Sequence, residues 1–274
     1  MSLAAGAANP QMVAAAFGGS GHILVVVPAF NEANNVGTVV EEIRMTQLPV
    51  LVIDDGSVDS TAAVAAEHGA TVVRLPINLG VGGALRCGFR YAVQHDFDVV
   101  VQCDGDGQHI ANAISSLIRV MVDKKAHLVI GSRFTEAHAP VGRLRRAVMR
   151  LLSAVASHRA GVALTDTTSG FRAIRMPLLA AFATTYPSQY LGDTFEALMS
   201  AASSGYTVAE VAVPMRPRLS GRSTASTSAA LKYVSRAIIM IVLGPRTRMP
   251  TVEQSSTGVA AIPGPRKEDN DFHC

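Results

Sequence analysis

The chain has 274 residues, of which 49% are hydrophobic and 16% are charged, and its formal net charge is +3. This length and apolar content are enough for a large core, and so mild a charge argues against a general nucleic-acid-binding protein. The chain contains no run of roughly 18 apolar residues, which a membrane-spanning helix needs, and its first 20 residues lack the pattern of a signal peptide.

The three cysteines are far apart and show no zinc-binding spacing, which argues against a disulfide framework and for a reducing compartment. We therefore expect a cytoplasmic protein, with peripheral attachment to the inner face of the membrane as a second option.

The first half of the chain alternates β-branched apolar runs with helical patterns. The runs expected to form strands are 23–27, 50–53, 71–75, 99–103 and 127–130. Helical patterns occupy the segments between them and end near Ile43, Gly69, Gln94 and Val122. This alternation predicts an α/β fold, a doubly wound and mainly parallel Rossmann-like sheet with helices on both faces.

The second half is less regular. We expect a basic amphipathic helix at 143–160, a turn-rich loop at 166–172, a helix from Asp193 to near Gly205, a strand at 206–213 and a basic loop at 217–224. The arginines of the 143–160 segment fit either an anionic acceptor group or an ordinary solvated helix face.

The expected domain layout places one domain between two tails. Residues 1–20 are expected to be a disordered tail, 21–226 the domain, 227–244 an amphipathic helix and 245–274 a second disordered tail. The apolar stripe of the 227–244 helix fits packing on the domain or binding in a membrane interface, and packing is favoured.

Polar residues follow three of the predicted strands at the point where each ends. They are Asn31 and Glu32, Asp54 and Asp55, and Asp104 and Asp106. In a doubly wound sheet, the carboxyl ends of parallel strands share one crevice, which is where such folds bind ligands. Several carboxylates in one crevice need cations or sugar hydroxyls as partners, so we expect a nucleotide near Asp55 and its diphosphate near Asp104 and Asp106.

Asp104 and Asp106 are the expected metal ligands. Residues two apart in an extended segment point to the same side, and two converging carboxylates repel each other unless a cation lies between them. Mg²⁺ and Mn²⁺ prefer oxygen ligands and complete their shells with water and phosphate. A solvated Asp-Gly turn is the alternative for this motif alone.

Several motifs, taken in order, resemble the family 2 glycosyltransferases of GT-A fold, and among them the polyprenyl- or dolichyl-phosphate mannose or glucose synthases. The motifs are Val27-Pro28-Ala29-Phe30-Asn31-Glu32, Asp54-Asp55-Gly56-Ser57, Asn78-x-Gly80-x-Gly82-x-Ala84, Asp104-Gly105-Asp106-Gly107-Gln108-His109, Gly131-Ser132-Arg133-Phe134, Ser169-Gly170-Phe171-Arg172 and Val213-Pro214-x-Arg216-Pro217-Arg218. The resemblance covers about residues 22 to 225.

The resemblance implies a role for each matched position. Base and ribose contacts would come from Pro28, Phe30, Glu32, Ile53 and Asp55, and metal contacts from Asp104, Asp106 and Gln108. Gly105 would lie near the donor, and Arg133 and Arg218 would contact phosphates. Thr224 stands where these synthases often have a lysine, and Arg222 is the nearby substitute for that charge.

The expected reaction is transfer of a sugar, with inversion, from a GDP- or UDP-sugar to an acceptor, most simply a polyprenyl phosphate. A lipid phosphate is already anionic, whereas a hydroxyl acceptor of a small molecule or glycan needs a general base. Asp193 is the candidate base, with helix capping as its alternative role.

Two other classes of protein also carry parts of this pattern. Asp54-Asp55 after a strand is found in phosphoacceptor signalling domains, although these are much shorter than this chain. An Asp-x-Asp motif also serves phosphohydrolases, although there it usually follows the first strand of the sheet, whereas here it follows the fourth.

Overall fold

The computed structural model describes residues 10–108, 111–132, 143–187, 193–214, 216 and 249–252, with the backbone alone for 143–149. Within these residues the strands form one seven-stranded sheet in the order β3-β2-β1-β4-β6-β5-β7. The strands are β1 (Ile23–Ala29), β2 (Val50–Asp54), β3 (Thr71–Arg74), β4 (Val99–Gln102), β5 (Leu128–Ser132), β6 (Arg172–Arg175) and β7 (Val208–Ala212).

All of the strand pairs are parallel except those of β6. This strand runs antiparallel between β4 and β5, and Arg172 pairs with Gln102 on one side and with Ile130 on the other. β1 pairs with both β2 and β4, so the ends of these three strands lie next to one another. The turn-rich loop expected at 166–172 therefore runs into a strand that the sequence did not reveal.

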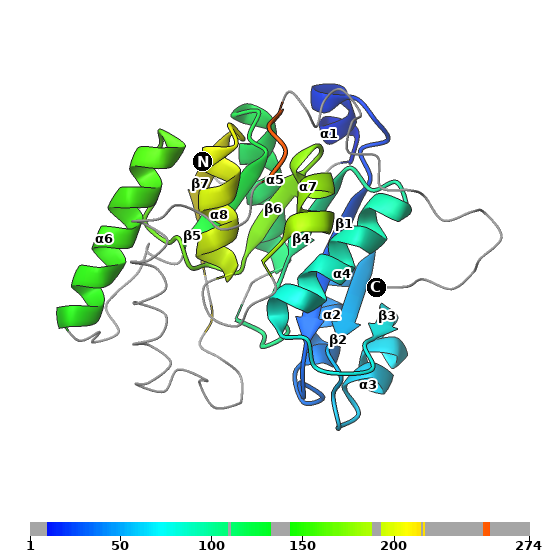
Figure 1. Ribbon diagram of the computed structural model, residues 1–274. Coiled ribbons are helices and arrows are strands. Elements are labelled where there is room, and N and C mark those ends of the chain that lie inside the picture. The colour runs from blue at the N-terminus through cyan, green and yellow to red at the C-terminus, as the bar shows by residue number, and fades with distance from the viewer. Residues whose placement is uncertain are drawn as a thin grey trace, which may run out of the picture.

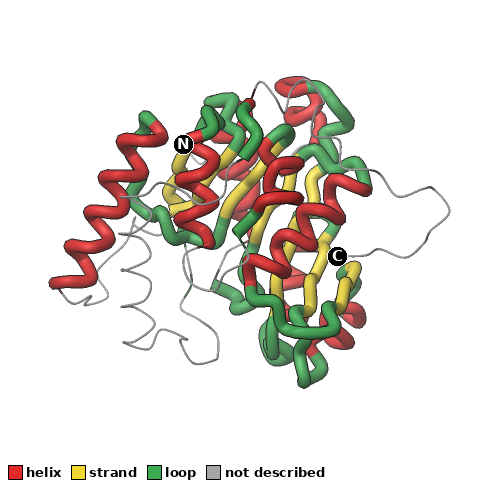
Figure 2. The backbone as a smooth tube through the Cα atoms, viewed as in Figure 1, coloured by secondary structure: helices red, strands yellow, loops and turns green. Residues whose placement is uncertain are grey.

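Helices cover both faces of the sheet (Figures 1 and 2). One core lies between the sheet and α4 (Val81–Gln94), α6 (Arg143–Ala160), α7 (Leu178–Thr185) and α8 (Asp193–Ser203). The other lies between the sheet and α1 (Pro10–Phe17), α2 (Val36–Arg44), α3 (Thr61–Glu67) and α5 (Ile114–Asp123), which the 3-10 turn η1 (Ala111–Ala113) precedes. The expected doubly wound sheet is confirmed.

The strands are buried because their residues are apolar on both faces. Every residue of β2, β4 and β5 is buried, as expected for a sheet with helices on both sides. β3 lies at one edge of the sheet, and Thr71 and Arg74 at its two ends are exposed.

The structure corrects the expected tails. Residues 10–17 form α1, and Val13 is buried in the core beside α5. Residues 249–252 pack on the domain, where Met249 is buried and the carbonyl of Pro250 accepts a hydrogen bond from the Tyr206 hydroxyl. The Ala- and Gly-rich composition of 1–20 and the polar composition of 245–274 predicted disorder. A few apolar side chains nevertheless pack residues 10–17 and 249–252 against the domain.

Cys103, which follows β4, is a buried free thiol. In the described part of the chain, none of the helices combines the length and the hydropathy that a membrane span requires.

Candidate functional site

The three polar strand ends meet around the end of β1. The Asp55 amide donates a hydrogen bond to the Ala29 carbonyl. On the other side of β1, a Cβ atom on Gly105 would lie 3.4 Å from the Pro28 carbonyl oxygen and 3.6 Å from the Ala29 Cβ. The loops that carry Asp55 and Asp104 are therefore neighbours, as the parallel topology predicted.

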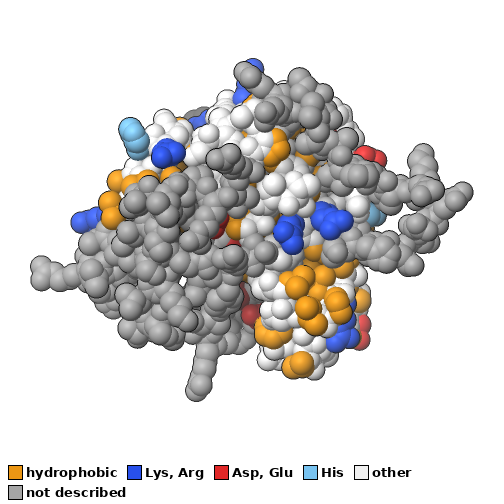
Figure 3. Space-filling model, in the orientation of Figure 1, with side chains coloured by type: hydrophobic (Ala, Val, Ile, Leu, Met, Phe, Trp, Pro, Cys, Tyr) orange, Lys and Arg blue, Asp and Glu red, His pale blue; other side chains and the backbone are white. Residues whose placement is uncertain are grey.

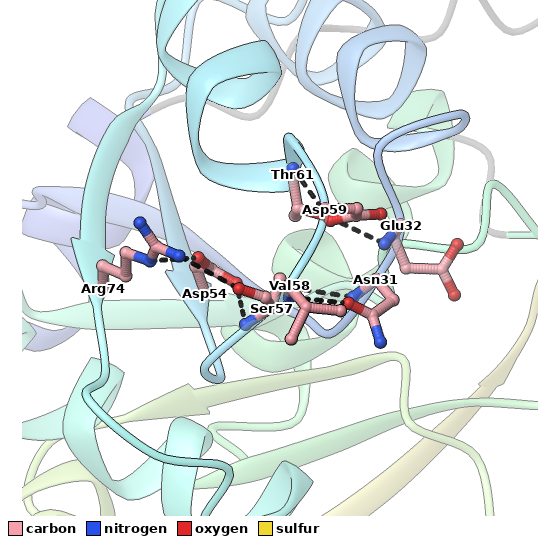
Figure 4. A network of polar contacts seen from close by, with 8 residues as sticks. All are labelled: Asn31, Glu32, Asp54, Ser57, Val58, Asp59, Thr61 and Arg74. Atoms are coloured by element: carbon pink, nitrogen blue, oxygen red, sulfur yellow. Dashed lines mark hydrogen bonds and ion pairs between the residues drawn. The ribbon is translucent and has the colours of Figure 1, made fainter.

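A polar network joins the loop after β1 to the loop after β2 (Figure 4). The Asn31 amide donates to Ser57 Oγ, and the Asn31 side-chain oxygen accepts from the Val58 amide. Asn31 has φ of +55°, a conformation that asparagine tolerates better than most residues. The Glu32 amide donates to Thr61 Oγ1, while the Glu32 carboxylate accepts from Asn35 Nδ2.

Asp54 has a structural role in this network. Its Oδ1 accepts from the Ser57 amide, and its Oδ2 lies 3.3 Å from Arg74 Nε. Arg74 also donates to the Ser57 carbonyl. Because Asp54 is fully buried and paired, it is not available as a phosphoacceptor.

Asp55, the next residue, is only 3% exposed. Its Oδ1 accepts a hydrogen bond of 2.7 Å from the Leu79 amide. Burial raises the pKa of Asp55, against the opposing effect of the backbone hydrogen bonds from Leu79 and Gly80. Asp55 thus fixes the loop before α4 at the edge of the crevice.

Apolar side chains are exposed on the three loops that follow β1, β2 and β3, and at the start of α4. Phe30 is 45% exposed and Val58 is 90% exposed, and Ile77, Leu79 and Val81 are also exposed. Figure 3 shows hydrophobic side chains gathered on the lower part of the molecule, where α3 and β3 lie in Figure 1. Exposed apolar groups next to Asp55 are suited to stacking against a flat ring such as a nucleotide base.

The loop after β4 carries the two candidate metal ligands, Asp104 just before a turn and Asp106 within it. Asp106 is buried and Asp104 is half-buried, and Asp106 Oδ1 accepts from the Gln108 amide. Gly107 has φ of +75°, which lets the chain reverse here. The tight turn that the glycines predicted is present, and the convergence of the two carboxylates on one ion stays a prediction. Burial first, and then the charges of Asp104 and Asp106, raise the pKa of Cys103.

Two further segments close around this loop. The amide of Arg216 donates to the Gln108 carbonyl, and the guanidinium of Arg216 pairs with Glu42 of α2. On the other side, a Cβ atom on Gly170 would lie 2.7 and 2.8 Å from the two carboxylate oxygens of Asp104. A side chain at position 170 would therefore force the Asp104 carboxylate to move.

Asp193 is the first residue of α8 and is 6% exposed. Its Oδ1 accepts from the Thr194 amide, and its Oδ2 has no hydrogen-bond partner among the described residues. Burial raises the pKa of Asp193 to about 6; the nearby charge of Arg172 lowers it and that of Asp104 raises it. Asp193 combines a local capping bond with a carboxylate oxygen left for another partner.

Tyr186 is a second unsatisfied group in the same region. It is fully buried against Phe89 and Phe182, and its hydroxyl has no partner in the described part of the chain. Burial raises the pKa of Tyr186, and the charges of Asp193 and Asp104 raise it further. Tyr186 carries no signal in the sequence, because an apolar environment around a tyrosine gives no motif.

The structure brings together only part of the predicted site. Pro28, Phe30, Glu32, Asp55, Gly105 and Gln108 lie at the same sheet edge as Asp104 and Asp106. Ile53 does not expose its side chain there, since it is wholly buried in the core. Arg133, Arg218, Arg222 and the 227–244 helix lie outside the described residues.

The donor set suits a hard divalent cation, although it is small. Within the described residues no group of three His, Cys, Asp or Glu side chains is arranged to hold a metal ion. Two carboxylates and the Gln108 amide oxygen nevertheless match Mg²⁺ or Mn²⁺, which often use few protein ligands and obtain the rest from water and phosphates.

Comparison with known proteins gives a consistent result. Residues 24–182 match the family model described as Glycosyl transferase family 2. The polyprenol monophosphomannose synthase of Mycolicibacterium smegmatis is 31% identical over 220 residues, which are 75% of this chain and 81% of that protein. The dolichyl-phosphate hexose transferase of Haloferax volcanii is 30% identical over 229 residues, which are 83% of this chain and 96% of that protein.

A solved structure shares the fold. Glucosyl-3-phosphoglycerate synthase from Mycobacterium tuberculosis, crystallised with Mg²⁺ and uridine diphosphate, superimposes with a TM-score of 0.65 at 24% identity. The match covers 89% of this chain and 84% of that chain. At this identity the likeness is evidence for a GT-A fold and for nothing finer.

Proposed function

The chain belongs to glycosyl transferase family 2 and is a glycosyltransferase, and we propose that it transfers a sugar, with inversion, from a nucleoside-diphosphate sugar to a polyprenyl phosphate. The observation that carries the proposal is the meeting of the Asp55 and Asp104 loops around the end of β1. The names of the two relatives support the lipid-phosphate acceptor.

Each part of the site has a task in this reaction. Phe30 and the loop held by Asp55 form the side of the crevice that would receive the base and ribose. Asp104, Asp106 and Gln108 would hold Mg²⁺ or Mn²⁺, which supplies charge stabilisation for a departing diphosphate when it is bound. Arg133 and Arg218, and Arg222 in place of the missing lysine, stay predictions for phosphate contact.

The test is transfer from radiolabelled UDP- and GDP-sugars to undecaprenyl phosphate, with Mg²⁺, Mn²⁺ or EDTA. We expect a lipid-linked product that requires a divalent ion, and its anomeric configuration, read by NMR, to be inverted relative to the donor. A purified, folded chain that transfers none of the sugars to the lipid would contradict the polyprenyl-phosphate proposal.

A hydroxyl acceptor is the second candidate, and Asp193 favours it. A buried carboxylate with a pKa raised to about 6 and one unpartnered oxygen is suited to accept a proton near neutral pH. A lipid phosphate is already anionic and has little need of such a base. The Asp193→Asn variant separates the two acceptors, because it should lose transfer to a hydroxyl but keep most of the transfer to a lipid phosphate.

A further inference from the structure

Arg172 of β6 is a charged residue inside the sheet. It is only 1% exposed, and it is among the largest fully buried side chains of the described residues. No carboxylate in the described ranges lies within ion-pair distance of its guanidinium. A buried guanidinium is costly unless its donors are satisfied, so its contacts should reveal its role.

All of its described hydrogen bonds go to backbone carbonyls of two separate segments. Nε donates to Ser169 at 2.8 Å and Nη2 donates to Thr167 at 3.1 Å, both in the turn before β6. Nη1 donates to Thr194 at 2.8 Å, in the first turn of α8. One rigid, planar group therefore joins the turn to the helix.

One of these segments lies against an acidic group of the candidate site, and the other contains one. The turn includes Gly170, whose backbone lies against the carboxylate of Asp104. The helix begins with Asp193, whose Oδ1 accepts from the amide of Thr194, the residue that also contacts Arg172. We propose that Arg172 is a positioning residue that sets Asp104 and Asp193 relative to each other; this inference rests on the proposed glycosyl transfer at that site.

The geometry explains why the residue is arginine. Three carbonyls in three directions need the planar fork of a guanidinium, whereas a lysine ammonium has a different reach and shape. The positive charge also lowers the pKa of Asp193 and of Tyr186. Arg172 therefore combines a mechanical link with a charge that favours the ionised form of Asp193.

Arg175, at the other end of the same strand, provides a matched control. Its guanidinium also donates to three backbone carbonyls, those of Ala126, Met176 and Lys125. These carbonyls lie at the other end of the strands, away from Asp104 and Asp193. A purely structural role predicts similar consequences for the loss of either arginine, whereas a positioning role predicts different ones.

The experiment compares Arg172→Gln, Arg172→Lys and Arg175→Gln in the full chain. We expect all three to lower Tm, and the two Arg172 variants to lower kcat by about 100-fold, with KM for the nucleotide sugar within about threefold of wild type. Mn²⁺ affinity, read by electron paramagnetic resonance without donor, should fall in the Arg172 variants only. Equal losses of kcat in Arg175→Gln, or unchanged kcat in Arg172→Gln, would overturn the proposal.

A second variant tests the link if Arg172→Gln does not fold. Gly170→Ala keeps Arg172 but places a Cβ against the Asp104 oxygens, so it should weaken Mn²⁺ binding and lower kcat at least tenfold with a small change in Tm. Wild-type Mn²⁺ affinity and kcat in this variant would also contradict the proposal.

Hydrogen exchange separates this inference from the proposed function. Exchange at 167–171 and 194–197 should rise in Arg172→Gln and not in Arg175→Gln, whatever sugar or acceptor the enzyme uses. If the wild type transfers no sugar, the proposed function fails. If exchange in these two segments is the same in both variants, the positioning role fails.

Discussion

The two ends of the sheet use their polar residues differently. At the end where β4, β5 and β7 begin, the described polar groups connect one segment to another. Asp98 accepts from Ser20 Oγ and from the His22 amide, and His127 Nδ1 accepts from the Thr207 amide. Arg175 adds three backbone carbonyls at this end, and each of these groups has its partner.

At the opposite end, buried polar atoms are left without described partners. In the described ranges, atoms of this kind occur in Gln102, Thr167, Tyr186, Asp193 and Ser200, and in Asp54, where Arg74 makes an ion pair instead. Gln102 ends β4 and Thr167 contacts Arg172. Ser200 is the exception, because it lies two turns along α8 from Asp193, toward the start of β7. Unsatisfied buried groups cost stability, so their concentration at one end indicates a site kept ready for a ligand.

The sharpest test of this difference removes one acidic group from the end that carries Asp104, Asp106 and Asp193, which is called the ligand-binding end below. Asp106→Ala should reduce sugar transfer by about 1000-fold or more, because a divalent ion loses one of its two carboxylates. Initial rates at saturating Mn²⁺ and donor would measure the loss. Asp98→Ala is the matched change at the other end, and it should lower Tm but leave kcat near the wild-type value.

Undiminished transfer by Asp106→Ala would show that the β4 loop does not hold the catalytic ion. A comparable loss of kcat in Asp98→Ala would show that the two ends are not functionally distinct.

A second test measures stability at the ligand-binding end. Asp193 has a pKa raised to about 6 from 3.8, so folding becomes less favourable as pH rises from about 4 to 6 and its carboxyl must ionise. Asn keeps an oxygen for the Thr194 amide and carries no charge. Asp193→Asn should therefore raise Tm at pH 8 by a few degrees and change it little at pH 4.

Calorimetry of the two proteins at both pH values would measure this gain. A lower Tm of Asp193→Asn at pH 8 would mean that the ionised Asp193 carboxylate has favourable partners in the folded protein, so that its burial does not cost stability.

The sequence predicted the grouping of the acidic strand ends better than it predicted the whole fold. Apolar runs that stop at Asn31, Asp54 or Asp104 mark the ends of buried strands, and parallel topology then places those ends together. The interpretation needed no knowledge of long-range contacts beyond that rule. The contact of Ile53 with the base was implied by the family resemblance alone, and the Ile53 side chain lies in the core.

The sequence did not reveal β6 or Arg172. β6 has four residues, Arg-Ala-Ile-Arg, with a charge at each end, so its composition is typical of a loop. Its burial depends on antiparallel pairing with two strands that are distant in the sequence, and no local pattern reports this. The roles of Arg172 and Tyr186 likewise depend on which segments the fold brings to them.

The smallest expected effect concerns His127, at the end of the sheet where β4, β5 and β7 begin. Burial, followed by the nearby charge of Arg175, lowers the pKa of His127 from 6.5 to about 4. Since the unfolded chain binds the proton more readily, stability falls as pH drops from about 6.5 to 4 and is level below that. His127→Asn offers an oxygen to the Thr207 amide without titrating, so its Tm should decline less over this pH range than that of the wild type, while kcat at pH 7.5 is unchanged. If the Tm values of the two proteins change with pH in parallel, the neutral form of His127 does not contribute to stability. If kcat falls in His127→Asn, polar groups at both ends of the sheet serve the reaction.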